Sequence, residues 1–203
     1  MNFLKMLGKN KQQQLPKYWR RLMRHFDGAF ELRCETKTDI KLEDIIQLEC
    51  LNSARRTGKG VDSLADIQKR QQHQLPLTHA SGLLVTLRHE GTILGGGLAY
   101  LCGNEAYYIV LAHDIAYEHL HIGTLIVWKT IESAIEQGMT RFNFLWGRQT
   151  YKTQFLGVDY PWTIHIISQY ALLAIAWKYL IIFKEFQTRV WRFVKTRLGF
   201  LKQ

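Results

Sequence analysis

The sequence has few cysteines, and their spacing fits neither a disulfide framework nor a zinc knuckle. Cys34, Cys50 and Cys102 are the only three in 203 residues, and no Cys-x-x-Cys pair is present. An odd and widely separated set argues against both a disulfide-stabilised secreted domain and a metal-binding module. We therefore expect a cytoplasmic protein in a reducing compartment.

Targeting segments and internal repeats are also lacking. The N-terminal residues include lysines but no apolar segment followed by a cleavage site, so no signal peptide is expected. A hydrophobic content of 47% with six tryptophans excludes a disordered chain. The length suits one folded domain with terminal extensions.

Acidic residues are nearly missing from both ends of the chain. Residues 1–26 carry seven lysines and arginines and no acid, and residues 160–203 carry seven with Glu185 as the only acid. The net charge of +10 therefore belongs to the ends, while residues 27–159 carry a net charge of −3. This distribution disfavours nucleic-acid binding by the central part of the chain.

Hydrophobic periodicity predicts the order strand, two helices, three strands, helix and strand. Strands are expected over 29–35, 82–88, 92–101, 105–111 and 141–145, and helices over 42–54, 62–74 and 122–138. A short basic helix is expected over 17–26, after a stop at Pro16. Three consecutive glycines, 95–97, lie inside one strand, where they indicate either a tightly packed sheet centre or a strand on which a ligand or a neighbouring helix lies.

The most informative region runs from residue 92 to residue 155. A strand is followed by a loop containing histidines, and a helix begins at Ile122-Gly123-Thr124. The first N–H groups of a helix are unpaired and its dipole is positive there, so this order of elements predicts an anion site. After the next strand come Trp146-Gly147 and then Tyr151-Lys152, which place a phenol and an amine where open α/β sheets bind ligands.

These features together resemble the GNAT acyltransferase superfamily. More closely, they resemble the branch that contains the CelD/BcsL-type proteins of bacterial polysaccharide synthesis and, more remotely, the FemAB-type aminoacyl transferases. The resemblance is carried by Tyr107-Tyr108, Asp114, Gly123-Thr124-Leu125, Gly138, the strand 142–145, Gly147 and Tyr151-Lys152. It implies an α/β (α+β) GNAT-like fold, with a mostly antiparallel twisted sheet flanked by helices. The implied domain is 29–168, between a basic N-terminal segment, 1–28, and a basic, aromatic helical segment, 169–203.

The resemblance also implies an acyl donor and a site for it. Acetyl-CoA or another acyl-CoA is the expected co-substrate, bound by Ile122, Gly123 and Thr124. The loop before this helix is His119-Leu120-His121, whereas the superfamily usually has more glycine there and an Arg or Gln ahead of it. The plainer interpretation of Gly123 is an ordinary helix start.

Asp114, Tyr151 and Lys152 are the candidate catalytic residues. In this interpretation Asp114 acts as a general base on the acceptor side, Tyr151 protonates the leaving thiolate, and Lys152 binds an anionic acceptor or a phosphate. Arg148-Gln149 stands where the branch usually carries an acid. The alternatives are that Asp114 caps a local turn, and that Tyr151 packs while Lys152 is solvated.

Three histidines, His113, His119 and His121, lie in or beside the same loop. An imidazole titrates near neutrality, so any of them is an alternative general base. Their loop setting gives no pair of ligands at helical i, i+4 spacing, and we expect no metal. Trp128 shares a helix face with Ile131 and is expected in the core.

The C-terminal segment suggests a surface contact. Residues 164–183 are apolar, but His165, Gln169 and Lys178 interrupt them, which disfavours a membrane span. The basic, aromatic residues that follow suit an amphipathic helix on anionic lipid. The alternative is a helix packed on the domain with a solvated basic face.

Three functions remain open from the sequence. The first is an N-acyltransferase that acts on an amino sugar or another cell-envelope precursor, peripherally at the inner face of the cytoplasmic membrane. The second keeps the fold but takes the acyl group from aminoacyl-tRNA, in which case the basic ends contact RNA. The third is an inactive GNAT-fold protein that serves as an envelope-associated interaction partner.

Overall fold

The computed structural model describes residues 3–55, 62–147 and 149–161, together with Ile175, Tyr179 and Phe183. The chain divides into two compact units, Met1–Asp159 and Tyr160–Gln203. No helix among the described residues is long and apolar enough to cross a membrane. The predicted amphipathic helix lies almost wholly outside the described residues, and the predicted boundaries after residues 28 and 168 stay predictions.

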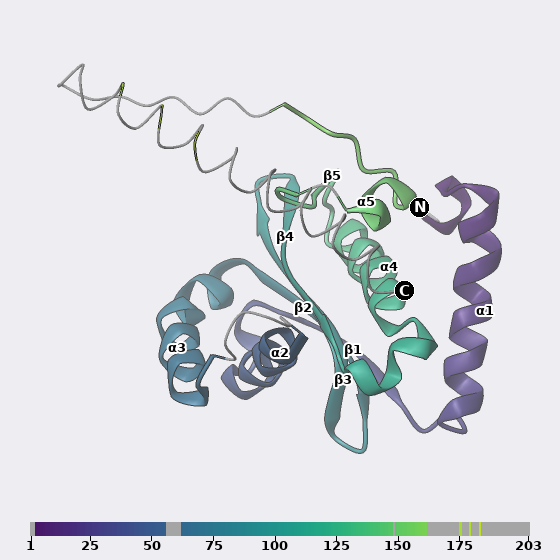
Figure 1. Cartoon of the computed structure of the whole chain (residues 1–203), viewed down its shortest axis with the longest axis horizontal. Coiled ribbons are helices and arrows are strands. Elements are labelled where there is room, and N and C mark those ends of the chain that lie inside the picture. The colour runs from purple at the N-terminus through teal and green to yellow at the C-terminus, as the bar shows by residue number, and fades with distance from the viewer. Residues whose placement is uncertain are drawn as a thin grey trace, which may run out of the picture. The chain divides into compact units, whose positions relative to one another are not determined.

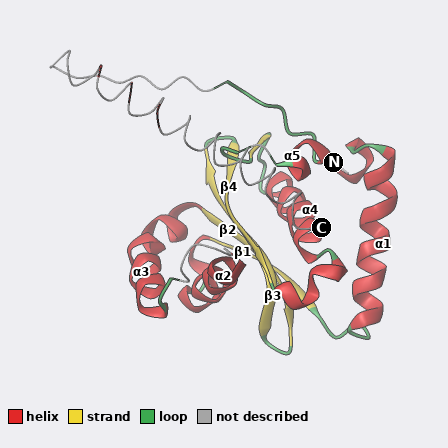
Figure 2. Ribbon diagram, viewed as in Figure 1, coloured by secondary structure: helices red, strands yellow, loops and turns green. Residues whose placement is uncertain are grey.

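A five-stranded sheet forms the centre of the first unit (Figure 2). Its strands lie in the order β1 to β5, and the first four are antiparallel to their neighbours. The last strand pairs parallel with the start of β4. The bounds are β1 (Glu31–Thr36), β2 (Gly82–His89), β3 (Thr92–Cys102), β4 (Glu105–His113) and β5 (Arg141–Asn143). This sheet, with helices on both faces, confirms the predicted α/β fold.

Two pairs of helices cover the two faces of the sheet (Figure 1). Helices α1 (Lys9–His25) and α4 (Ile122–Glu136) lie on one face, and α2 (Leu42–Arg55) and α3 (Leu64–Ser81) lie on the other. Each face buries its own hydrophobic core, and Trp128 of α4 is in the first of these, as predicted. The shorter helices are η1 (Phe3–Met6), η2 (Lys37–Asp39), η3 (Ile115–Leu120) and α5 (Thr150–Gln154).

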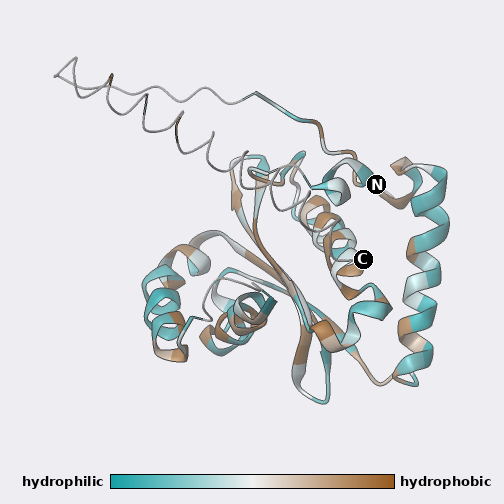
Figure 3. Ribbon diagram, viewed as in Figure 1, coloured by the Kyte–Doolittle hydropathy of each residue, from teal (hydrophilic) through white to brown (hydrophobic). Residues whose placement is uncertain are grey.

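Two of the helices are longer than the sequence suggested, because proline does not end them. Helix α1 begins at Lys9 and contains Pro16, and α3 continues through Pro76. A proline inside a helix removes one backbone hydrogen bond. In α1 the loss is offset by packing, since Leu15 and Leu22 are fully buried in the core while the outer face of the helix is hydrophilic (Figure 3).

The glycines of β3 allow helices to approach both faces of the sheet closely. A Cβ atom added to Gly95 would lie 2.7 Å from Cγ2 of Ile122 in α4, and one added to Gly96 would lie 3.0 Å from Cδ1 of Leu48 in α2. Any side chain at these positions would push a helix away from the strand. The glycine run therefore lies in a tightly packed part of the sheet, and neighbouring helices lie directly on the strand there.

The sheet opens between β4 and β5. These strands pair only over residues 105–107 and 141–143. The predicted strand 141–145 ends early because Leu145 has a positive φ of 57° and its N–H donates to Oδ1 of Asn143. On its other edge β4 carries a bulge, since Leu98 pairs with Val110 and the next residue of β3 pairs with Tyr108. Within the described residues, no strand covers the edge of β4 beyond Tyr107.

Candidate active site

A cleft of about 570 Å³ lies where β4 and β5 separate. Its walls come from residues 108–111 of β4, residues 144–146 after β5, the N-terminus of α4, the end of α2 and the start of α5. Four of the six predicted site residues line it, namely Gly123, Thr124, Tyr151 and Lys152. Ile122 is fully buried beneath it, and Asp114 is not part of its lining.

The N-terminus of α4 has two unpaired backbone donors, and one of them belongs to Gly123, which lines the cleft. The N–H groups of Thr124 and Leu125 donate to the carbonyl of His121, at 3.0 and 3.1 Å. Those of Ile122 and Gly123 have no hydrogen-bond partner in the part of the chain that the structure describes. Two unpaired donors at the positive end of a helix dipole form an anion site. Thr124 was also predicted to bind through this helix start, but its N–H is already engaged.

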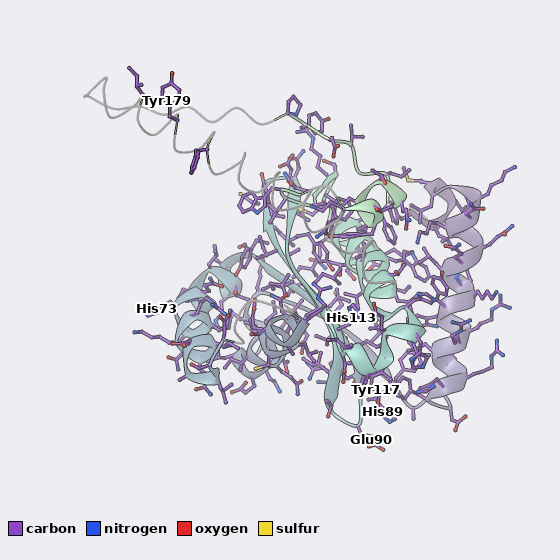
Figure 4. All side chains as sticks on the ribbon, viewed as in Figure 1. His73, His89, Glu90, His113, Tyr117 and Tyr179 are labelled. Carbon is purple, nitrogen blue, oxygen red and sulfur yellow. The ribbon has the colours of Figure 1, made fainter. Side chains whose placement is uncertain are left out.

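His113 lies directly against Gly123, between the sheet and α4 (Figure 4). A Cβ atom on Gly123 would lie 2.9 Å from Nδ1 of this imidazole. That nitrogen is buried and has no hydrogen-bond partner among the residues described. Burial lowers the pKa of His113, and the charge of Arg55 lowers it further. The imidazole is therefore neutral near pH 7, with a nitrogen lone pair or N–H available.

Asp114 is occupied by a local contact. Its Oδ1 accepts a hydrogen bond from the backbone N–H of Ala116 at 2.9 Å, so the side chain caps η3. This contact is the one that the turn-capping interpretation requires. The general-base role of Asp114 stays a prediction, and the carboxylate lies outside the cleft lining.

Tyr151 presents a half-buried phenol to the cleft. Its ring packs edge-on against Phe144, with ring centroids 5.9 Å apart. Burial raises the pKa of the phenol, and the charge of Arg55 opposes part of that rise. Tyr151 is therefore protonated at neutral pH, the state in which it can donate a proton.

Lys152 is bound to the loop that follows β5. Its Nζ donates to the carbonyl oxygens of Phe144, Leu145 and Trp146, at 2.8, 3.3 and 2.9 Å. Burial lowers the pKa of this ammonium group, while the carbonyls oppose that shift because they accept from the protonated form. The contacts give Lys152 a positioning role in this loop, and its predicted binding of an anion stays a prediction.

The other two histidines of the loop contact α1. The ring of His121 stacks on Tyr18, with centroids 3.9 Å apart, and the carbonyl of His119 accepts from Nη1 of Arg21 at 3.2 Å. No group of three or more potential metal ligands occurs within the described ranges. The supporting role of α1 was not predicted, because it depends on contacts between residues about a hundred positions apart.

Arg55 is a cleft residue that the sequence analysis did not single out. It follows the predicted helix 42–54 and is the last residue of α2, and its Nη2 donates to the carbonyl of Leu111 at 2.9 Å. Its charge lowers the pKa of Tyr108, His113 and Tyr151, so it lies close to the polar groups of the cleft. No local pattern indicates this contact. Arg148, another basic residue of interest, lies outside the described residues.

The sheet is mostly antiparallel and opens at the parallel pair of β4 and β5, next to the N-terminus of α4. Residues 9–153 of the sequence match the family described as acetyltransferase (GNAT) domain. The chain belongs to the GNAT family and is an acyltransferase of the GNAT type. The matched residues include all of α1.

Solved structures of acetyltransferases share the fold. An aminoglycoside acetyltransferase from an uncultured soil metagenomic sample, in complex with sisomicin, is 19% identical, with a TM-score of 0.48 over 71% of this chain and 99% of that one. A possible acetyltransferase from Clostridium difficile 630 is 13% identical, with a TM-score of 0.50 over 70% and 99%. Glucosamine-6-phosphate N-acetyltransferase from Arabidopsis thaliana is 14% identical, with a TM-score of 0.44 over 70% and 98%. No curated protein matches the sequence.

Proposed function

We propose that this protein transfers the acetyl group of acetyl-CoA to the amine of an amino sugar or another cell-envelope precursor, as a member of the CelD/BcsL-like branch. The observation that carries the proposal is the unpaired N–H groups of Ile122 and Gly123 at the start of α4, where Gly123 lines the cleft. The branch is proposed from the strand 142–145 and Tyr151-Lys152, whose order and spacing resemble it.

The residues of the cleft fit an acyl-CoA. The N–H groups of Ile122 and Gly123 would hold the pyrophosphate. The uncovered edge of β4 beyond Tyr107 offers backbone groups to the amides of pantetheine, in the manner of an added strand. Arg21 and Lys11 of α1 add positive charge near this loop, because both lower the pKa of His121. When bound, acetyl-CoA supplies the thioester that the amine attacks.

Two side chains are suited to the proton transfers. Tyr151 is protonated at neutral pH and would give its proton to the leaving thiolate sulfur. His113 is neutral and its imidazole lines the cleft, so it would accept the proton that the attacking amine loses. His113 suits this role better than Asp114, whose carboxylate caps η3 outside the cleft lining.

The phosphate site is tested by placing a carboxylate in it. Gly123→Asp should abolish acetyl-CoA binding in isothermal titration, because a negative side chain would meet the phosphates at the helix N-terminus. The same side chain would also collide with His113, so the double variant Gly123→Asp/His113→Ala separates charge from clash and should bind no better. Gly8→Asp is the matched control, since Gly8 precedes another helix and has open space around it.

Unchanged acetyl-CoA affinity in the folded double variant would remove the phosphate site from the start of α4. If wild-type protein bound aminoacyl-tRNA in a salt-sensitive manner and showed no acetyl-CoA binding, the FemAB-like donor would replace acetyl-CoA. The basic ends of the chain are the feature that favours this second candidate.

We also propose peripheral contact with an anionic membrane through the C-terminal segment. Residues 184–203 contain six lysines and arginines and one acid, whereas residues 27–159 carry a net charge of −3. Ile175, Tyr179 and Phe183 follow one another at intervals of four residues, and each is more than half exposed. Basic residues next to exposed apolar side chains are the combination that binds anionic lipid.

A further inference from the structure

Arg55 brings a positive charge into the cleft. Its guanidinium uses Nη2 to bind the carbonyl of Leu111, which leaves its remaining N–H groups available. No acidic side chain pairs with Arg55 within residues 3–55, 62–147 and 149–161. Across the same ranges, Glu118 is the only acid that lines the cleft.

Arg55 enters the cleft from the face opposite to the proposed donor site. It ends α2, which covers one face of the sheet, while the free N–H groups of Ile122 and Gly123 belong to α4 on the other face (Figure 1). Phosphates held at the start of α4 would leave the guanidinium unoccupied. A guanidinium left unoccupied by the donor would be free to bind an acceptor that enters from the face of α2.

The other cation of the described lining is not available for this role. All three N–H bonds of the Lys152 ammonium group are directed to backbone carbonyls. Arg55, by contrast, keeps the planar fork of donors that binds carboxylate and phosphate groups in pairs of hydrogen bonds.

The charge of Arg55 affects the pKa values of the residues proposed to carry out the chemistry. It lowers the pKa of both His113 and Tyr151. All three residues line the same cleft, so an anionic group bound by Arg55 would lie in the cleft that holds the reacting amine. The same charge lowers the pKa of a nearby amine and repels a polycation.

We propose that the acceptor is an amine that also carries a phosphate or carboxylate group, and that Arg55 binds this group. The inference rests on the proposed donor site at the start of α4, because that site determines which face is left for the acceptor. It makes Arg55 a specificity-determining residue, and it predicts discrimination against neutral and polycationic amines.

Matched pairs of amines test the proposal in protein saturated with CoA, which blocks the phosphate site. One pair is glucosamine and glucosamine 6-phosphate, and the other is ethanolamine and its phosphate ester; glucosaminuronic acid supplies the carboxylate. In isothermal titration the anionic member of at least one set should bind at least about tenfold more tightly than the neutral member. This is the gain in affinity that a charge-assisted hydrogen bond typically gives. A preference for glucosamine 6-phosphate over glucosaminuronic acid, or the reverse, identifies the anionic group.

Three variants assign the effect to Arg55. Arg55→Gln should abolish the preference for the anionic member, Arg55→Lys should keep part of it, and Arg70→Gln should leave it unchanged because Arg70 lies on α3, paired with Asp62. The KM for acetyl-CoA should stay constant in all three. Equal binding of the neutral and anionic amines within every set, or a preference that survives Arg55→Gln, overturns the inference. A wild-type protein that binds no CoA overturns the proposed function instead.

Discussion

Gly123→Ala is expected to destabilise the protein when residue 113 is histidine and to stabilise it when residue 113 is alanine. The φ of Gly123 is not positive, so alanine is compatible with this helical backbone and should stabilise it by about 0.5–1 kcal/mol. The new methyl group, however, would lie 2.9 Å from Nδ1 and 3.2 Å from Cε1 of His113, and the three atoms nearest to it all belong to that side chain.

The clash outweighs the helical gain in the wild-type background. Inserting a methyl group into a closely packed position typically costs about 1–3 kcal/mol, and the imidazole has little freedom because it is half-buried between the sheet and α4. Gly123→Ala should therefore lower the free energy of unfolding by about 1–2 kcal/mol. In the His113→Ala background the same change should raise it by about 0.5–1 kcal/mol.

Urea unfolding of wild type, the two single variants and the double variant at pH 7.5 gives the coupling energy. A value of about 2 kcal/mol is expected, within the range for residues in contact. A coupling energy below about 0.5 kcal/mol would refute the contact between His113 and Gly123. It would also remove packing against His113 as the reason for glycine at position 123. The close approach of a bound anion would then be the remaining explanation for this glycine.

Four further expectations test other parts of the site and of the chain. Tyr151→Phe should lower kcat by about 10²–10⁴-fold with little change in urea midpoint, and wild-type turnover would exclude the phenol as the acid. Lys152→Gln should destabilise the protein by about 1–2 kcal/mol and weaken binding in the cleft, since it releases three carbonyls that position the loop 144–146; an unchanged unfolding curve contradicts this. Burial lowers the pKa of His113 and His121 below 6.5, so the unfolded chain binds more protons than the folded protein in acid. The free energy of unfolding should therefore be at its full value above about pH 6.5 and fall as the pH drops below it. The fall should be less steep in His113→Gln. Deleting residues 184–203 should release the protein from anionic vesicles at low salt in a sedimentation assay, because a net charge of +5 is lost, and equal pelleting would assign the contact to another segment.

The sequence predicted the sheet well because the apolar residues that favour strands locally in β2 and β3 are also the residues that the fold buries. The turn at Glu90-Gly91 was recognisable, and both residues have the positive φ values that such a hairpin needs. Helices α2 and α4 were also found within a residue or two of their bounds. Prolines misled the prediction for α1 and α3, since burial of Leu15 and Leu22 compensates for a hydrogen bond that a local rule counts as decisive.

The site was predictable where it depends on one element and not where it depends on several. Gly123 and Tyr151 follow motif positions within one stretch of chain, and both line the cleft. The contacts of Lys152 with three carbonyls depend on how the chain turns after β5, where Leu145 adopts a positive φ. Arg55 reaches Leu111 across 56 residues of sequence, and no local pattern reports such a contact.

The three carbonyls around Lys152 have a consequence for the durability of the enzyme. A cleft that promotes attack by amines on a thioester exposes its own lysine to the same reaction, and an acetylated lysine would lose its charge. Here three carbonyls accept hydrogen bonds from Nζ, at 2.8 to 3.3 Å, and so stabilise the ammonium form, which has no lone pair with which to attack. We therefore expect the loop at residues 144–146 to make Lys152 a poor acceptor for the acyl group.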